Sequence, residues 1–462
     1  MDNSKHTMMT TKPVGELIIK MAAASIVIML VTALYNLTAS YFVSHLGTNA
    51  IAAVGVSFPL QAVIQAIGFF FGQGAGNYIS RSLGALEHDK AAKMAATGFF
   101  SAFFISTLLS ISCLLFLNPL VRLLGATDSI LPFAVDYLRW IIIAAPFMVS
   151  SFMLNNLLRF QGAANLAVIG IVSGVVVNVG LTPLFIFTFD MGMTGAALAG
   201  MISQIISSLV LFLIVCYGKD IVRIRFGNFT FKFSVYKNII NGGTPSFLRQ
   251  GLLSVSTILL NHAAGNYGES VIAALSVVTR IVMIAAAIVL GIGQGYQPVC
   301  GFNYGAGLFQ RVRSGFWFTV RSTTIFLIIA ALAGYIFSPQ LISIFGHEDK
   351  IVIDVGSHAL RFQCLILPFS AFIIVMNMML QTTGKTVPAS ILALSRQGLF
   401  LIPLLYTLVP LWGVLGIELC TPIADSLTFI LTIILGRKAL TELKQGGNES
   451  HIGFVKKENR KD

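Results

Sequence analysis

The stretch Gly72-Gln73-Gly74 lies near the end of one long apolar run, and Gly293-Gln294-Gly295 lies at the matching place in another run, 221 residues further along the chain. Other pairs at this offset, or at 222 after one inserted residue, are Ile51-Ala52-Ala53 with Ile272-Ala273-Ala274, Leu138-Arg139 with Leu360-Arg361, and Asn155 with Asn377. The matches keep their order across most of both halves. We therefore infer that the chain contains an internal duplication.

The composition is that of a membrane protein. Of the 462 residues, 56% are hydrophobic and only 10% are charged, and the mean hydropathy is +0.85. A soluble protein of this length needs far more charged residues to cover its surface. Soluble globular proteins, disordered proteins and nucleic-acid-binding proteins are therefore excluded, although the net charge is +12.

Twelve apolar runs are each long enough to cross the roughly 30 Å hydrocarbon layer of a bilayer as a helix. They cover residues 14–44, 50–80, 92–117, 131–158, 164–188, 195–217, 237–264, 270–299, 312–337, 351–381, 386–410 and 414–436. The first run follows a polar segment, residues 1–11, and shows no cleavage pattern. We expect it to be a membrane anchor and not a signal peptide.

The positions of Lys and Arg predict the orientation of these spans. With both termini in the cytoplasm, most Lys and Arg residues fall in cytoplasmic segments, and only Arg122 and Lys350 fall outside. Positive residues are retained on the cytoplasmic side of membranes. The sequence therefore predicts a multi-pass protein of the plasma membrane that ends in a basic cytoplasmic tail, residues 438–462.

The duplication predicts two lobes with six spanning helices each. We expect an N-terminal lobe over residues 1–217, a cytoplasmic linker over 218–236 and a C-terminal lobe over 237–437. Because six is an even number, both lobes enter the membrane in the same direction, and a pseudo-twofold axis along the membrane normal relates them. The predicted fold is an all-α integral membrane protein whose lobes enclose a cavity and expose it to each side in turn.

The sequence contains no motif of enzymatic chemistry. It lacks a zinc-type cluster of His and Cys and a phosphate-binding Gly-Lys-Ser/Thr loop, and its five cysteines are scattered through apolar runs. We therefore expect no enzyme activity, no bound metal and no cofactor. The expected partners are small-molecule substrates and the lipid bilayer, with the chain acting as a monomer.

Charged residues within the spans are the first candidate functional residues, because an ionisable group in the membrane costs roughly 2.5–3.5 kcal/mol on insertion scales. Arg396 and Asp425 lie at similar depths in neighbouring spans and can pair. Glu418 lies seven residues before Asp425, about two helical turns away on the same face. Three roles stay open for these residues: an ion pair that fixes helix packing, a site that exchanges H⁺ or Na⁺ during transport, or an inert carboxylate exposed to water.

Fixed positive charge exceeds negative charge within the C-terminal lobe, which carries several arginines deep in its spans. Such a cavity can accept anionic or zwitterionic solutes. Polar residues within spans also avoid lipid and tend to line wet cavities or to bond neighbouring helices. The predicted substrate-cavity residues are Tyr35, Asn36, Asn155, Asn178, Arg280, Arg361, Gln363, Asn377 and Gln397.

Several motifs resemble those of the multidrug and toxic compound extrusion (MATE) family. They are Leu34-Tyr35-Asn36 followed by Phe42-Val43-Ser44-His45-Leu46-Gly47, the segment from Gly72 to Ala85, the segment from Gly293 to Ala306, and Pro422-Ile423-Ala424-Asp425. The similarity covers about residues 14–437 in order. It implies an antiporter that exports organic, often cationic compounds in exchange for inward Na⁺ or H⁺, and it implies no cofactor.

The chain departs from the family pattern at the expected carboxylates. Many members carry an aspartate on the first and on the fifth span, and these places are taken here by Ala39 and Thr182. Carboxylates that other members use in the C-terminal lobe are also missing from the middle of its spans, where only Glu269 and Asp354 stand near span ends. The coupling residues therefore have to be sought among this chain's own charges.

Two alternatives to multidrug export stay open. The same architecture serves flippases that move a lipid-linked or anionic solute across the bilayer, and arginines in the cavity favour such a cargo. A membrane scaffold that transports nothing is the second alternative.

Overall fold

The computed structural model describes residues 3–218, 222–346 and 349–458. These residues form helices joined by short connections, and no strand occurs among them. The chain divides into two compact units, one made of Met1–Met9 with Ala24–Phe247 and one made of Thr10–Ala23 with Leu248–Asp462. We call them unit 1 and unit 2.

Unit 1 contains the helices of the N-terminal half. They are α1 (Asn3–Thr11), most of α2 (Val14–Ser44), α3 (Thr48–Gly84), α4 (His88–Leu115), α5 (Leu117–Leu123), α6 (Leu131–Phe160), α7 (Ala164–Pro183) with the π-helical turn η1 (Leu184–Thr188), α8 (Gly192–Tyr217), the short turn η2 (Phe226–Asn228) and the first half of α9 (Phe233–Gly265). Helix α6 packs against α3, α4 and α8 and is the most buried span of this unit.

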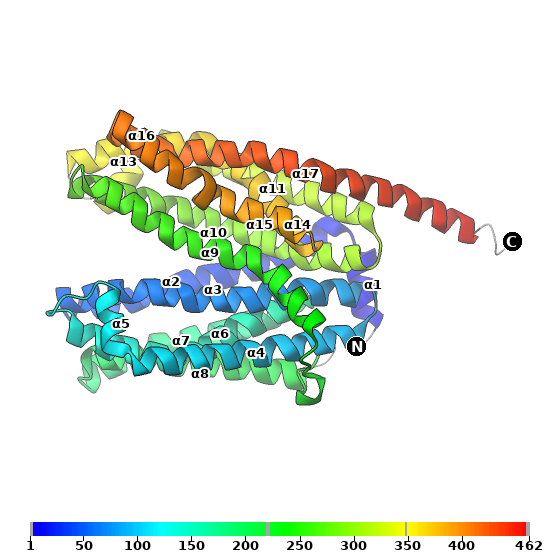
Figure 1. Ribbon diagram of the computed structural model, residues 1–462, viewed down its shortest axis with the longest axis horizontal. Helices are drawn as coiled ribbons and strands as arrows, with labels where there is room; N and C mark the ends of the chain where they lie inside the picture. Colours follow the sequence, from blue (N-terminus) through cyan, green and yellow to red (C-terminus); the bar gives the residue numbers. More distant parts are fainter. Residues whose placement is uncertain (1–2, 219–221, 347–348, 459–462) are drawn as a thin grey trace. The chain divides into compact units, whose positions relative to one another are not determined.

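Unit 2 contains the helices of the C-terminal half (Figure 1). They are α10 (Glu269–Gly305), α11 (Phe309–Ile336), α12 (Ser338–Gly346), α13 (Lys350–Ile366) with η3 (Leu367–Phe369) and α14 (Ser370–Thr382), α15 (Thr386–Leu394) with the π-helical segment η4 (Ser395–Leu401) and α16 (Ile402–Trp412), and α17 (Val414–Glu458). Helices α13 and α14 together form its central span and pack against α10, α11 and α17.

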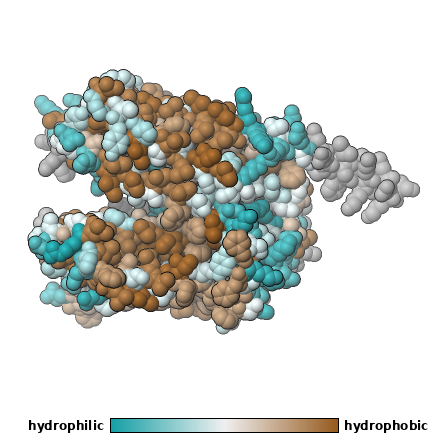
Figure 2. Space-filling model, in the orientation of Figure 1, coloured by the Kyte–Doolittle hydropathy of each residue, from teal (hydrophilic) through white to brown (hydrophobic). Residues whose placement is uncertain are grey.

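Eleven helices, or helix pairs joined in line, are long and apolar enough to cross a membrane among the residues that the structure describes. The predicted span 237–264 forms helix α9, which is not among the eleven because its middle carries polar residues and Arg249. Its 33 residues still give it a length of about 50 Å. On the visible face of each unit, hydrophobic side chains cover the middle and hydrophilic ones gather at the ends (Figure 2).

The two units differ from the predicted lobes in two segments. Residues 10–23, which cover the end of α1 and the start of α2, belong to unit 2, and the start of α9 up to Phe247 belongs to unit 1. The physical reason is a close approach at the repeated Gly-Gln-Gly motif. A methyl group on Gly74 would lie within 3.0 Å of the α9 backbone at Ile239, and one on Gly295 would lie as close to the α2 backbone at Ala22.

Three predicted spans are not continuous α-helices. Pro368 lies in the 3₁₀ turn between α13 and α14, and Pro403 follows the π-helical segment η4 between α15 and α16. Proline lacks the N–H that continues a helix ladder, and a π-helical turn shifts the following side chains around the helix axis. In the third of these spans, residues 164–188, helix α7 continues as the π-helical turn η1 directly after Pro183.

Asp349 is the N-cap residue of α13. The Asp349 carboxylate accepts hydrogen bonds from the Ile351 backbone N–H at 2.9 Å and from the Ser270 hydroxyl at 2.8 Å. The Ser270 hydroxyl and this backbone N–H lower the pKa of Asp349 below its ordinary value of 3.8. The cap thus joins the start of α13 to the start of α10.

We expect Asp349→Asn to lower the melting temperature slightly near neutral pH, because a charged acceptor makes the stronger hydrogen bonds. Since the folded-state pKa is depressed, this contribution is present above the unfolded pKa and is lost as the pH falls through the folded pKa. Thermal melts of both proteins in detergent between pH 7 and pH 3 should therefore converge in acid. Exposed Asp354→Asn is the control, and a difference that persists at the lowest pH would contradict this assignment.

Candidate coupling and binding site

A buried ion pair joins two segments of unit 2. The Arg396 guanidinium donates to both carboxylate oxygens of Asp425, Nε to Oδ1 at 2.6 Å and an Nη to Oδ2 at 2.9 Å. Gln363 donates a third hydrogen bond to Oδ2 at 3.1 Å. Asp425 is fully buried, whereas the Arg396 side chain remains 28% exposed. The pairing predicted from equal depth is therefore present, and the carboxylate is enclosed by nitrogen donors.

The elements that position this pair are irregular. Arg396 lies on η4, whose backbone is also held from α9 by the Ser256 hydroxyl, which donates to the Gln397 carbonyl at 2.9 Å. Asp425 lies on α17, one turn after Pro422. A π-helical turn is rare and frequently lies at a functional site. The arginine of the buried charge pair lies on such a segment.

Glu418 is the second carboxylate of this region. It lies on α17, is 7% exposed, and has no hydrogen bond or ion pair with any described residue. Seven residues separate it from Asp425, which is about 10 Å along the helix. A buried, charged carboxylate without a partner costs free energy, and binding a proton removes this charge.

Gln363 and Arg361 both lie on α13, so the central span of unit 2 contributes an amide and a cation. Gln363 contacts Asp425, as described above. The Arg361 guanidinium carbon lies 5.8 Å from the centre of the Tyr335 ring, and its buried Nε has no hydrogen-bond partner. Tyr335 was not predicted from the sequence, because an aromatic residue at the end of an apolar run gives no signal of its role.

The other candidates in unit 2 are dispersed. Arg280 on α10 has an exposed side chain and no partner among the described residues. Asn377 on α14 is buried and donates to the Ala389 carbonyl at 2.7 Å, while its Oδ1 has no partner. Gln397 is half-buried next to Arg396. The structure brings Gln363, Arg396 and Asp425 into direct contact, and among the described residues the side chains of the other three form no hydrogen bond with them.

The candidates in unit 1 are neutral. Asn155 on α6 and Asn178 on α7 are buried, and the Nδ2 of the first and the Oδ1 of the second have no hydrogen-bond partner in the part of the chain that the structure describes. Tyr35 on α2 is half-buried, with its hydroxyl beside Gly200 of α8. The side chain of Asn36 lies outside the described residues. Thr182, at the place of the family's second aspartate, is also buried one turn after Asn178, and its hydroxyl has no hydrogen-bond partner among the described residues.

The predicted candidates of the two units therefore differ in charge. Those in unit 1 are neutral amide and hydroxyl groups, whereas those in unit 2 include a carboxylate bound by arginine together with further cations. Among the described residues, no group of three or more His, Cys, Asp or Glu side chains is placed to hold a metal ion. The arrangement can exchange a proton at a carboxylate and offers polar groups to an organic solute.

Comparison with known proteins places the chain in a family. The family model described as MatE matches residues 24–184 and 245–407. The multidrug export protein MepA of Staphylococcus saprophyticus is 29% identical over 89% of this chain and 92% of that protein. A crystal structure of MATE in the bent conformation has a TM-score of 0.90 and 25% identity over 96% of this chain and 99% of that one.

A further similar structure is that of a MOP superfamily transporter from Pyrococcus furiosus, described as having a binding pocket of reversed polarity that suggests a different function. It has a TM-score of 0.89 and 25% identity, covering 96% of this chain and all of that one. The family model alone covers more than half of the sequence, in both halves of the duplication. The chain therefore belongs to the MATE family of multi-pass membrane transporters, a family without enzymatic activity.

Proposed function

We propose that this protein is a secondary active multidrug exporter of the plasma membrane that couples efflux to inward movement of H⁺ at Asp425. The observation that carries the proposal is a fully buried aspartate, in a membrane span of a MATE family chain, whose charge is balanced by one partly exposed arginine. The relatives named multidrug export proteins support the export of small organic molecules. We further propose that both termini are cytoplasmic and that the monomer is the functional unit.

The surroundings of Asp425 favour H⁺ over Na⁺. Sodium needs several oxygen ligands, but the groups that contact this carboxylate are nitrogen donors of Arg396 and Gln363. A proton needs only one carboxylate oxygen. The nearby Ser426 and Thr428 hydroxyls donate to backbone carbonyls of their own helix. The donor set therefore supports proton binding at an Asp425 oxygen.

Protonation of Asp425 changes what Arg396 binds. Arginine stays charged under physiological conditions, so a neutral Asp425 leaves its guanidinium without a counter-charge. Because the Arg396 side chain is already 28% exposed, it can leave the carboxylate and move toward water. This movement pulls on η4, the π-helical segment that carries it, and a shift of η4 moves α15 relative to α17. Proton binding is thereby converted into a change of helix packing within unit 2.

Glu418 serves as the second proton-binding group in this proposal. It lies closer to the start of α17 than Asp425 does, at the end predicted to face outside. An unpartnered, nearly buried carboxylate accepts a proton from water at that end. The proton then reaches Asp425, about 10 Å further along the helix, through intervening water.

We propose organic, cationic amphipathic compounds as substrates. The Oδ1 of Asn178 and the hydroxyl of Thr182 are buried acceptors without partners, and a protonated amine can donate to both. Aromatic rings such as that of Tyr35 attract cations through their π-faces. A second candidate, export of an anionic solute, is favoured by Arg280 and Arg361, neither of which contacts a carboxylate among the described residues.

Dye transport in everted vesicles from efflux-deficient bacteria tests this proposal. We expect vesicles with the protein to accumulate ethidium when a proton gradient is imposed, and to release it when nigericin collapses the gradient. Replacing Na⁺ by K⁺ should have no effect. Accumulation that requires a Na⁺ gradient would reject proton coupling, and accumulation of carboxyfluorescein in place of ethidium would identify the anionic substrate class.

A further inference from the structure

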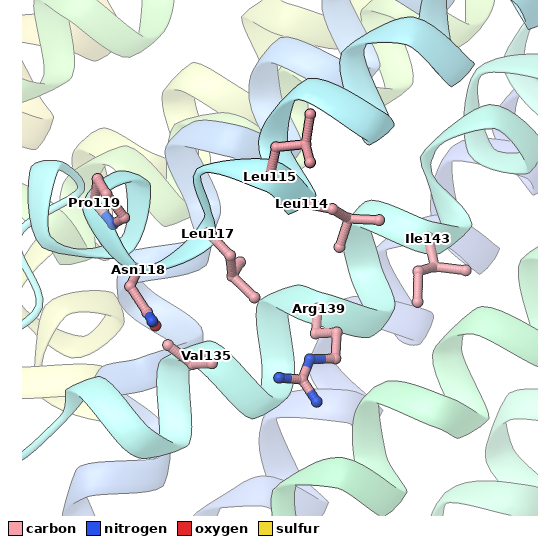
Figure 3. A pocket seen from close by; sticks show the side chains of 8 residues that line it. All are labelled: Leu114, Leu115, Leu117, Asn118, Pro119, Val135, Arg139 and Ile143. Atoms are coloured by element: carbon pink, nitrogen blue, oxygen red, sulfur yellow. The ribbon is translucent and has the colours of Figure 1, made fainter.

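A pocket in unit 1 contains a charge that the proposed transport mechanism does not use. It has a volume of about 380 Å³ and lies where α4 ends, beside α5 and the first part of α6 (Figure 3). Val135, Arg139 and Ile143 come from successive turns of α6, and Leu114, Leu115 and Leu117 come from the neighbouring α4 and α5. The lining is thus mostly apolar with one cation.

Arg139 is the cation of this pocket. Its side chain is exposed and forms no hydrogen bond or ion pair with the described residues. Asp136, one turn earlier on α6, forms no ion pair with it, and Asp128 pairs instead with Arg122 at 2.9 Å. Arg139 lies eight residues into α6, about 12 Å from its start. A cation at this depth needs an anion or water, because its insertion into lipid is costly.

The second half of the duplication shows what occupies the equivalent place there. Helices α4 and α11 both have 28 residues and end directly before Phe116 and Phe337. This alignment makes Leu114 equivalent to Tyr335, while Arg139 is equivalent to Arg361 by the offset of 222. In unit 2 the Tyr335 ring lies over the Arg361 guanidinium. In unit 1 the leucine supplies no such ring, and the pocket lies beside the arginine.

The environment of the pocket identifies the kind of anion. Leu115 and Phe116, at the end of α4, are 74% and 65% exposed in a membrane-spanning unit, so this surface faces acyl chains. Arginine binds phosphate through two parallel N–H donors and keeps its charge at the membrane. An arginine can also extend its head toward the headgroup layer from a depth of several ångströms. A phosphate group attached to acyl chains satisfies both the cation and the apolar wall.

We propose that this pocket binds an anionic phospholipid, whose phosphate pairs with Arg139 and whose acyl chains lie along Leu114, Leu115 and Ile143. The lipid belongs to the leaflet at the α5 end of unit 1, which is the outer leaflet in the predicted orientation. The site is a specific lipid contact of the N-terminal half. In the C-terminal half, Tyr335 covers the equivalent Arg361 in place of the lipid.

Native mass spectrometry of the purified full-length protein tests the proposal. The protein in detergent is titrated with phosphatidylglycerol or with phosphatidylcholine, and bound lipids are counted. We expect the wild type to bind at least one phosphatidylglycerol about tenfold more tightly than phosphatidylcholine, since a charge-assisted hydrogen-bonded pair contributes enough for this factor. Arg139→Gln should lose this preference.

Two further variants keep the test independent of folding defects. Leu114→Tyr introduces the residue of the other half, retains Arg139, and should weaken phosphatidylglycerol binding about tenfold by filling the pocket and covering the guanidinium. Arg122→Gln removes an equally basic residue at the same end of unit 1, one that pairs with Asp128. The Arg122→Gln variant should bind phosphatidylglycerol as tightly as the wild type does.

Equal binding of phosphatidylglycerol by the wild type, Arg139→Gln and Leu114→Tyr would overturn the proposal. So would loss of binding in Arg122→Gln to the same extent, because general surface charge would then explain the preference. Competition by millimolar inorganic phosphate, with no preference for the lipid, would assign the site to a free anion and likewise reject the lipid.

Discussion

Asp425→Asn is expected to reduce dye efflux to the level of cells that lack the transporter, at equal amounts of protein in the membrane. Asparagine keeps the shape of the side chain and can still accept one hydrogen bond from Arg396 or Gln363. It cannot bind and release a proton. If Asp425 is the coupling residue, the proton gradient can therefore no longer drive efflux, although the shape of the cavity is unchanged.

The same change also removes the counter-charge of a partly buried arginine. Loss of one partner of a buried ion pair costs about 3–5 kcal/mol, and we expect the lower end of this range because the Arg396 side chain is 28% exposed. Membrane abundance and melting temperature must therefore be measured together with efflux. A lower abundance by itself would not identify a role in coupling.

The double variant Arg396→Gln with Asp425→Asn separates the two roles. It replaces the ion pair by two neutral amides that can bond each other, so we expect the melting temperature to recover most of the loss caused by Asp425→Asn. Proton-driven efflux should stay absent. Recovery of both stability and efflux would mean that the pair only fixes the packing of η4 against α17, and the coupling proposal would then be wrong.

Glycine-to-alanine changes in the repeated Gly-Gln-Gly motif are expected to have the second largest effect. In both Gly74→Ala and Gly295→Ala, the new methyl group would lie within 3.0 Å of backbone atoms of another helix, α9 in the first case and α2 in the second. Backbone atoms cannot rotate away as a side chain can, so the helices must separate. Overpacking of this kind costs about 1–3 kcal/mol or more.

We expect each variant to lower the melting temperature by several degrees and to reduce the amount of folded protein in the membrane, measured by fluorescence-detected size exclusion. The matched controls are Gly180→Ala in unit 1 and Gly251→Ala in unit 2, where an added methyl group meets nothing within 4 Å. Alanine favours a helix over glycine by about 1 kcal/mol, so these controls should be neutral or slightly stabilising. Equal losses in all four variants would contradict the role of the close approach.

The spanning helices could be predicted from sequence because hydrocarbon thickness sets their length and lipid excludes unpaired backbone groups. Predicted and observed ends of α2 agree at 14 and 44, and those of α6, 131–158 against Leu131–Phe160, agree within two residues. The short helices α5 and α12 were not predicted, since they lie in the connections directly after the predicted spans 92–117 and 312–337. The π-helical segment η4 was also not predicted, because no residue type specifies it.

The sequence by itself determined the membrane class, the duplication, the spans and the depth of Arg396 and Asp425, since all of these depend on local composition and spacing. Only the tertiary structure decided which charges pair. Arg396 meets Asp425 because α17 returns beside η4, whereas Glu418, Arg280 and Arg139 also lie within spans and form no ion pair with any residue that the structure describes. The structure also decided that the beginning of α2 belongs to unit 2 and the beginning of α9 belongs to unit 1. In the sequence, a glycine shows only that a helix could approach closely, because it has no side chain. Which helix approaches it depends on the packing of residues far away in the chain.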